Sequence, residues 1–202
     1  MIRLITATTA VLLLAGCNAP EPASAPDSAP VSPLPPADPA PVADNVLTPE
    51  GLGPIRIGMT ASEVAAAWGP TATPDAVGGP EPEVCSEYHP ARAPDGVNVM
   101  IQNGRLTRIT LIRDSDIRTD RGFGLGNAGA AIKAAYGGAI IAQPDKYAPA
   151  PAEDLIAWSR GGSTAYVEDP AARGIRYQIN GEGVAHIIHA GDPSIQLVEG
   201  CS

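Results

Sequence analysis

Aromatic residues are scarce in this chain, with two Trp, five Tyr and one Phe among 202 residues. Basic residues are few as well: 13 Lys and Arg stand against 22 Asp and Glu, so the net charge is −9. A chain without a basic stripe is a poor partner for nucleic acid. No H-E-x-x-H, G-x-S-x-G or phosphate-loop motif occurs. We therefore expect a protein that is not an enzyme, with no catalytic residue, no cofactor and no metal.

Long apolar runs are missing too, which argues against a permanent membrane span. The apolar stretch 4–14 follows Arg3, the only early charge, and small residues come after it. This pattern is typical of a secretory signal peptide over residues 1–16.

The end of that segment, Leu14-Ala15-Gly16-Cys17, resembles the lipobox of bacterial lipoproteins. The resemblance implies cleavage before Cys17 and acylation of this residue, by palmitate among other chains, which would hold the protein at a membrane. The alternative is an ordinary signal peptide with an incidental cysteine. Asn18, rather than an aspartate, favours the outer membrane, with the protein facing the periplasm.

Residues 17–49 are rich in Pro, Ala and Ser and contain no Lys or Arg. Such a segment buries too little apolar surface to offset the entropy of ordering, so we expect a disordered tether. The remainder, residues 50–202, has 12 basic and 18 acidic residues. It is long enough for one core, or for two small halves that share one.

Two short segments of this remainder share one pattern at an offset of 68 residues. Thr60 and Glu63 form a capping box in the first segment, where each side chain satisfies a backbone N–H at a helix start. The matching positions are Gly58 with Gly126, Val64 with Ile132, Trp68 with Tyr136, and Gly69 with Gly137. The pattern predicts two short helices and two tandem repeats, at 50–117 and 118–202.

Strand patterns follow each predicted helix. Asn103-Gly104 and Asn180-Gly181 each separate two apolar runs, which is a strong β-hairpin signal. The predicted strands cover residues 84–89, 97–101, 106–112, 155–158, 163–167, 175–179 and 184–189. The fold class is therefore α+β, in which each repeat is a short helix followed by about three antiparallel strands.

Two cysteines, Cys85 and Cys201, remain after the lipobox. In an oxidising envelope the simplest expectation is that they form a disulfide with each other. The alternative is a metal site built from Cys85 and His89, but no second pair of ligands lies nearby in the sequence.

Two other patterns carry little functional weight. Residues 124–129 spell G-x-G-x-x-G, but no apolar strand precedes them, as a dinucleotide site requires. His186 and His189 stand three residues apart on one predicted strand, so alternation separates them and we expect ordinary surface or edge histidines.

The first helix segment resembles a known family through Gly58-Met59-Thr60, then Val64, then Gly69-Pro70. It is similar to the helix motif of the SmpA/OmlA (BamE) outer-membrane lipoproteins, whose members help the β-barrel assembly machine. Tandem duplication of such a unit also resembles the β-lactamase-inhibitory-protein fold, in which two helix-plus-sheet repeats form a protein-binding face. The resemblance implies an α+β fold and binding to a protein.

The remaining candidate binding residues are aromatic side chains on or near the predicted strands. They are Tyr88, Tyr147, Trp158, Tyr166 and Tyr177. Aromatic residues are common interface anchors and also stack on sugars, although they could equally fill the core. We expect a lipid-anchored, non-catalytic module that binds an envelope protein, with a role in outer-membrane assembly or maintenance. The alternatives are a module that binds glycan or peptidoglycan and an inhibitor of a secreted enzyme.

Overall fold

The computed structural model describes residues 45–72, 80–162 and 166–202. The predicted signal peptide, Cys17 and most of the predicted tether lie outside the described residues. The boundary predicted at residue 49 is wrong, because Val46–Thr48 already forms strand β1 and Leu47 is fully buried. The folded body therefore starts before the end of the predicted tether.

Seven strands form the main sheet, in the order β4-β5-β6-β11-β10-β9-β8, and all neighbours are antiparallel. They are β4 (Cys85–Tyr88), β5 (Val97–Gln102), β6 (Arg105–Leu111), β8 (Ile140–Pro144), β9 (Glu153–Arg160), β10 (Arg173–Ile179) and β11 (Ala185–Gly191). Asn103 and Gly104 turn the β5–β6 hairpin with φ values of 50° and 75°, as the primed turns of hairpins require.

Six of the predicted strands correspond to strands of this sheet, with ends that differ by a few residues. The strand predicted over 163–167 is not present at Tyr166 and Val167; its other three positions lie outside the described residues. Strand β8, which was not predicted, pairs with β9 and forms that edge of the sheet.

The two helices are each eight residues long, and they start 68 residues apart, which is the offset between the two sequence patterns. Helix α1 (Ala61–Trp68) has the predicted capping box, with Thr60 Oγ1 accepting from the Glu63 N–H and the Glu63 carboxylate accepting from the Thr60 N–H. Helix α2 (Gly129–Tyr136) begins after Ala128, which makes no side-chain cap. Neither helix of the described region is long and apolar enough to cross a membrane.

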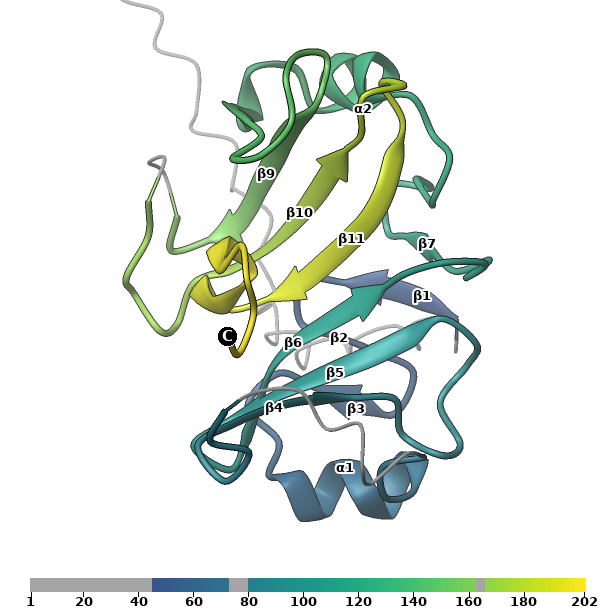
Figure 1. The fold of residues 1–202 in the computed structure, drawn as a ribbon, viewed down its shortest axis with the longest axis vertical. Coiled ribbons are helices and arrows are strands. Elements are labelled where there is room, and N and C mark those ends of the chain that lie inside the picture. Colours follow the sequence, from purple (N-terminus) through teal and green to yellow (C-terminus); the bar gives the residue numbers. More distant parts are fainter. Residues whose placement is uncertain (1–44, 73–79, 163–165) are drawn as a thin grey trace, which may run out of the picture. The chain divides into compact units, whose positions relative to one another are not determined.

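A second, small sheet was not predicted. Its strands are β1 (Val46–Thr48), β2 (Gly51–Leu52), β3 (Ile55–Arg56) and β7 (Arg118–Thr119), in the order β3-β2-β1-β7. Figure 1 shows this sheet behind the main sheet, with α1 and α2 at opposite ends of the folded body. The parallel β1–β7 pairing joins the start of the folded body to the middle of the chain.

The core lies on one face of the main sheet, against both helices and the small sheet. Its side chains include Val64 and Trp68 of α1, Ile132 of α2 and Leu47 of β1. Alternate strand residues such as Val99, Ile109 and Ile188 point into it. The fold class is α+β, as predicted, and strands that follow α1 and strands that follow α2 belong to one sheet, joined where β6 pairs with β11.

Candidate functional site

The other face of the main sheet, called the outer face here, carries a row of polar side chains across four strands. Asn98 of β5 is the cross-strand partner of Thr110 of β6, Thr110 is the partner of His189 of β11, and His189 is the partner of Arg176 of β10. Side chains directly opposite each other in a sheet are close neighbours. The row therefore forms one continuous polar strip across the β6–β11 junction.

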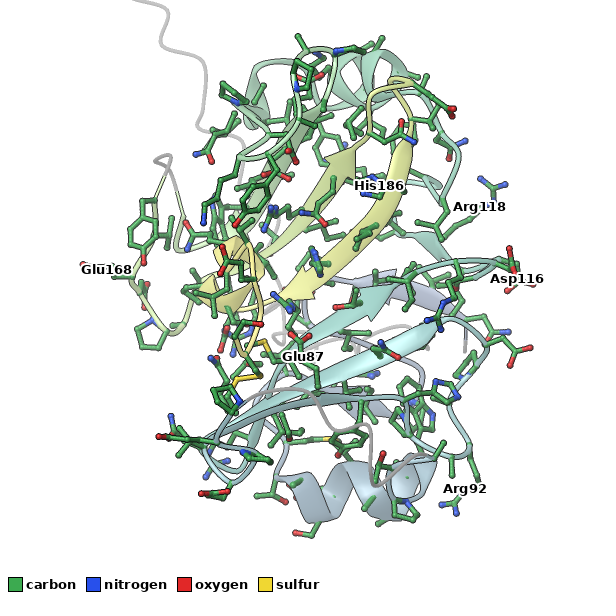
Figure 2. The ribbon with its side chains drawn as sticks, in the orientation of Figure 1. Glu87, Arg92, Asp116, Arg118, Glu168 and His186 are labelled. Atoms are coloured by element: carbon green, nitrogen blue, oxygen red, sulfur yellow. A yellow bond between two sulfur atoms is a disulfide. The ribbon has the colours of Figure 1, made fainter. Side chains whose placement is uncertain are left out.

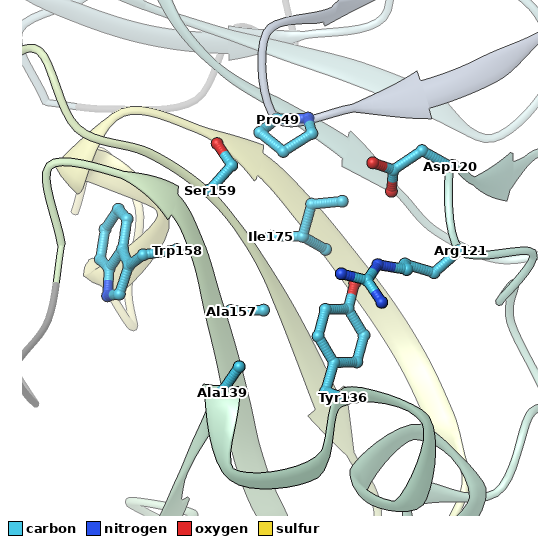
Figure 3. A pocket seen from close by; sticks show the side chains of 9 residues that line it. All are labelled: Pro49, Asp120, Arg121, Tyr136, Ala139, Ala157, Trp158, Ser159 and Ile175. Carbon is cyan, nitrogen blue, oxygen red and sulfur yellow. The ribbon is translucent and has the colours of Figure 1, made fainter. Parts of the chain in front are cut away.

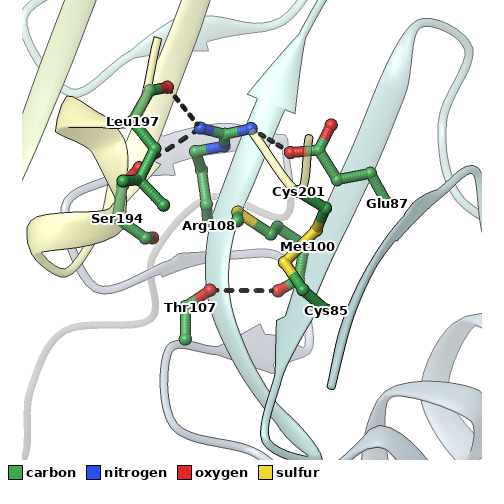
Figure 4. The surroundings of a disulfide bond; sticks show 8 residues. All are labelled: Cys85, Glu87, Met100, Thr107, Arg108, Ser194, Leu197 and Cys201. Atoms are coloured by element: carbon green, nitrogen blue, oxygen red, sulfur yellow. Dashed lines mark hydrogen bonds and ion pairs between the residues drawn. A yellow bond between two sulfur atoms is a disulfide. The ribbon is translucent and has the colours of Figure 1, made fainter. Parts of the chain in front are cut away.

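The last residues of the chain lie on this face. The segment Asp192–Cys201, called the strap here, starts with the 3-10 helix Pro193–Gln196 and ends in a disulfide between Cys201 and Cys85, whose Cα atoms are 5.4 Å apart. The disulfide is the one that the cysteine count predicts, and it fixes the end of the strap at strand β4 (Figure 4). Ile195 of the strap is fully buried.

Two buried arginines bind the strap from below. Arg108 Nη1 donates to the carbonyl oxygens of Ser194 (3.2 Å) and Leu197 (3.1 Å), while its Nη2 forms an ion pair with Glu87 (Figure 4). Arg176 Nη1 donates to the Ile195 carbonyl at 3.0 Å. The two guanidinium groups therefore hold the backbone of the strap against the outer face through its carbonyl groups.

Arg176 is also paired with Asp154 in a bidentate geometry. Its Nε lies 2.9 Å from Asp154 Oδ1 and its Nη2 lies 2.8 Å from Asp154 Oδ2. The two side chains are only 1% and 8% exposed. A buried pair of this kind has little net effect on stability when intact, but it is costly to break, because the remaining charge has no partner.

His189 is buried between the two arginines. Burial, followed by the nearby charges of Arg108, Arg176 and His186, lowers the pKa of the His189 imidazole well below its usual value. The Thr110 hydroxyl lies 3.0 Å from its Nδ1 and Gln178 Oε1 lies 3.4 Å from its Nε2. A neutral ring with its proton on Nε2 fits both contacts. The prediction of a surface or edge histidine is wrong for His189, because its side chain is only 6% exposed and its strand, β11, lies in the middle of the main sheet.

The hydroxyl–imidazole contact alone does not form an acyl-transfer site. In a catalytic triad, a carboxylate orients the imidazole and stabilises its charged form. Here the neighbour of the second nitrogen is the neutral Gln178 amide, and the nearby arginines disfavour a charged ring. The arrangement therefore suits hydrogen bonding better than proton transfer.

A cavity of about 260 Å³ opens above this strip, beside the strap. Polar side chains of the strip, aliphatic side chains and part of the strap line it. The lining residues are Glu87, Asn98, Val99, Arg108, Thr110, Ile112, Gln178, Ile187, His189, Val198, Glu199 and Gly200. Figure 2 looks onto this face, where Glu87 is labelled near the strap. We call this cavity the polar pocket.

The exposed large hydrophobic residues of the described chain lie on the strap or are connected to it. Val198 belongs to the strap, and Val84 precedes the disulfide-bonded Cys85. The Tyr147 hydroxyl donates to Glu199 of the strap, which also pairs with Lys146. Tyr166 precedes Val167, whose N–H and carbonyl both bond to the Gln196 side chain at 2.8 Å. We call these four residues and the strap the strap surface.

The predicted binding aromatics do not lie on one face. Tyr147 and Tyr166 are each 68% exposed. Tyr177 is fully buried, within hydrogen-bond distance of Tyr136 and Thr119, so it is a core residue and not a binding residue. Tyr88 is partly buried against the core. The Trp158 ring packs closely over the glycine backbone at positions 162 and 174 and is only partly exposed.

The glycines and the methionine of the predicted repeat signature have structural positions. Gly58 and Gly126 have φ values of 95° and 81° just before the helices, and their N–H groups bond to the carbonyls of Leu106 and Ala185 on the main sheet. Gly69 and Gly137 end the helices with φ values of 82° and 57°. Met59 packs against the core. All five residues therefore shape or support the fold.

A second cavity lies on the other side of the main sheet, beside α2 and β9 (Figure 3). Arg121 stacks over the Tyr136 ring at 4.8 Å, and burial raises the pKa of the Asp120 carboxyl although Arg121 opposes this effect. The volume of this second cavity, about 90 Å³, corresponds to roughly three water molecules. It is too small to be the main ligand site.

Within residues 45–72, 80–162 and 166–202, no cluster of three or more His, Cys, Asp or Glu side chains could hold a metal ion. Cys85 is in the disulfide, so it does not form a metal site with His89. The comparisons with protein-family models, with curated protein sequences and with solved structures found no match to this chain.

Proposed function

We propose that this chain is a lipid-anchored protein of the bacterial cell envelope that binds another envelope protein, without catalysis, through the strap surface. The supporting observation is the position of the exposed hydrophobic residues. In the described chain, Val84, Tyr147, Tyr166 and Val198 all belong to the strap or are connected to it. Exposed apolar groups that adjoin one segment of the chain favour an interaction site there, and tyrosine is a frequent anchor.

The anchoring of the strap favours such a role. The disulfide, two arginines and the Gln196 contacts hold the backbone beneath these side chains. A surface that is already ordered loses less entropy on binding, so more of the contact energy is available for affinity. The Lys146–Glu199 pair at Tyr147 would lie on the polar rim that surrounds such contacts.

The proposed setting follows from the N-terminal sequence. The lipobox-like Leu14-Ala15-Gly16-Cys17 supports a lipid anchor, Asn18 favours the outer membrane, and the tether would let the folded body work away from the lipid. Outer-membrane assembly or maintenance is the role we propose. Radioactive palmitate should label the wild-type protein but not the Cys17→Ala variant; undiminished label in the variant would contradict the anchor.

We also propose that the folded body arose from two copies of one helix-plus-sheet unit. The helix bounds Ala61–Trp68 and Gly129–Tyr136 differ by the same 68 residues as the sequence patterns. Each helix is followed by an antiparallel hairpin that turns at an Asn-Gly pair. Duplicated units commonly bury their cores against each other, which is consistent with the shared main sheet.

Photocrosslinking in intact cells tests the binding surface directly. A photoreactive phenylalanine analogue replaces Tyr147 or Tyr166 in the lipidated full chain, and a control chain carries it at Ala66, an exposed position on α1. We expect both strap positions to capture the same envelope protein and the control to miss it. Equal capture from Ala66, or no protein captured from either tyrosine, would contradict the proposal. Capture of one soluble secreted enzyme would instead favour an inhibitor.

A further inference from the structure

The polar pocket is lined mainly by polar side chains of the main sheet, whereas the strap surface beside it carries exposed hydrophobic residues. Asn98, Thr110 and His189 lie in register on three adjacent strands, and Gln178 comes from a fourth. No hydrogen bond to another described residue is recorded for the Asn98 side chain, and Gln178 uses only its amide oxygen, toward His189. The pocket therefore presents amide and hydroxyl groups that can still donate or accept.

The charges at the pocket are already neutralised by protein groups. Arg108 is paired with Glu87 through Nη2 and donates through Nη1 to two strap carbonyls, while no partner is recorded for its buried Nε; Glu199 is paired with Lys146. The imidazole of His189 is held neutral by its surroundings. A charged ligand would lose its hydration without gaining an unpaired opposite charge in return. The chemistry of the lining therefore favours an uncharged ligand.

The remaining lining is aliphatic. Ile112 and Ile187 lie on the side of the polar strip away from Arg108, and Val198 projects from the strap. The volume of about 260 Å³ is just below the range of about 300–1,000 Å³ typical of sites for drug-sized ligands. A group the size of one ring fits this space. The strap lies along one side, which leaves little room for an extended chain.

We propose that the polar pocket binds one uncharged sugar residue. A sugar ring offers several hydroxyl groups, each of which donates and accepts, to Asn98, Thr110 and Gln178, and it offers C–H groups to Ile112 and Ile187. The polar contacts of this site come from strand residues and not from the strap, so sugar binding and protein binding can be measured separately although Val198 and Glu199 border both. A neutral Asn or Gln side chain of a protein partner is the competing occupant.

Titration by NMR tests the proposal on the full chain with Cys17→Ala, kept oxidised. The probes are glucose, galactose and N-acetylglucosamine, with glucuronic acid as the charged counterpart of similar size. We expect saturable shifts in the side-chain amide signals of Asn98 and Gln178 with at least one uncharged sugar. Glucuronic acid should bind more weakly.

The variant Asn98→Ala removes one ligand contact without breaking a recorded hydrogen bond of the protein. We expect it to weaken sugar binding about two- to tenfold, the effect of one neutral hydrogen bond. Gln102→Ala is the matched control, because Gln102 lies on the same strand and the same outer face but does not line the pocket. The Gln102→Ala variant should bind sugar with the same affinity as the wild-type protein.

Three outcomes would overturn the sugar site. One is the absence of shifts with every sugar up to high millimolar concentration. Another is binding that Asn98→Ala and Gln102→Ala weaken equally. The third is a pocket that responds to an Asn- or Gln-containing peptide but to no sugar, which would assign it to the protein partner. Photocrosslinking from Tyr147 and Tyr166 reports on protein binding independently, so failure of the two proposals can be distinguished.

Discussion

The buried Arg176–Asp154 pair offers the sharpest test of how the strap is held. We consider Arg176→Met, which removes the charge but retains a long side chain that can still fill part of the space. The substitution leaves the Asp154 carboxylate only 8% exposed without its bidentate partner. It also removes the donor to the Ile195 carbonyl, which the arginine reaches at 3.0 Å.

The expected magnitude follows from these two losses. Breaking a buried ion pair on one side costs about 3–5 kcal/mol, because the remaining charge stays desolvated. A buried carbonyl that loses its donor costs about 1–3 kcal/mol by itself. The double variant Asp154→Leu/Arg176→Met has no unpaired charge, so only the carbonyl cost should remain. We therefore expect the double variant to be more stable than Arg176→Met alone by about 3–5 kcal/mol, the cost of the unpaired charge.

Urea unfolding of the oxidised chain with Cys17→Ala, followed by Trp68 and Trp158 fluorescence, measures these differences. Lys133→Met is the control, because the Lys133–Glu153 pair is more exposed, with side chains 42% and 22% accessible. It should cost at most about 1 kcal/mol. The reasoning fails if Arg176→Met costs no more than this control, or if the double variant is no more stable than Arg176→Met.

Three further predictions concern the disulfide, the buried histidine and the first helix. Unfolding the unreduced chain with Cys17→Ala should expose no free thiol, and changing both Cys85 and Cys201 to serine should cost about 4–5 kcal/mol in the chain-entropy model; two free thiols would refute the bridge. The folded-state pKa of His189 lies below its unfolded value, so its contribution to stability is complete above about pH 6.5. That contribution should decrease as pH falls below about 6.5, by at most about 1.4 kcal/mol per pH unit, until the folded-state pKa is reached. Urea titrations should show this slope in the wild type but not in His189→Gln, and an equal slope in both would contradict the assignment. Thr60→Ala should lower the free energy of unfolding by about 1 kcal/mol through loss of the capping box, whereas Thr60→Ser should be nearly neutral.

Local signals account for what the sequence predicted well. The helix α1 start depends on contacts between Thr60 and Glu63, three residues apart, and the β5–β6 turn depends on Asn103 and Gly104 alone. Such interactions are contained within a few neighbouring residues, so a single sequence reveals them. The disulfide could be predicted for a different reason, because only two cysteines remained to pair.

The small sheet could not be predicted in this way. Its strands are two or three residues long, too short to show a period of two. The pairing of Val46 with Arg118 joins segments far apart in sequence, and nothing near either residue indicates the other. Strand β8 ends at Pro144, a residue that normally argues against a strand but is tolerated at a sheet edge.

The alternation of side chains along the strands explains why the candidate sites could not be predicted from the sequence. Arg176 lies between the buried Ile175 and Tyr177 of β10, and Arg108 precedes the buried Ile109 of β6, both at positions that point away from the core. From sequence such positions read as solvent-exposed, and they would be so without the strap. The strap covers them only because Cys201 reaches Cys85 and because its carbonyls meet the guanidinium groups. Long-range closure of the chain therefore decides which polar residues are buried.

The same closure couples the two proposed activities. The strap supplies Val198 and Glu199 both to the strap surface and to the wall of the polar pocket. Replacing Cys85 and Cys201 with serine should therefore weaken crosslinking from Tyr147 and sugar binding together, in chains that remain folded. Asn98→Ala should affect the sugar alone, since Asn98 lies on β5 and no hydrogen bond between its side chain and the strap is recorded. If releasing the strap left both activities unchanged, the strap would only stabilise the fold, and both binding sites would have to lie elsewhere on the molecule.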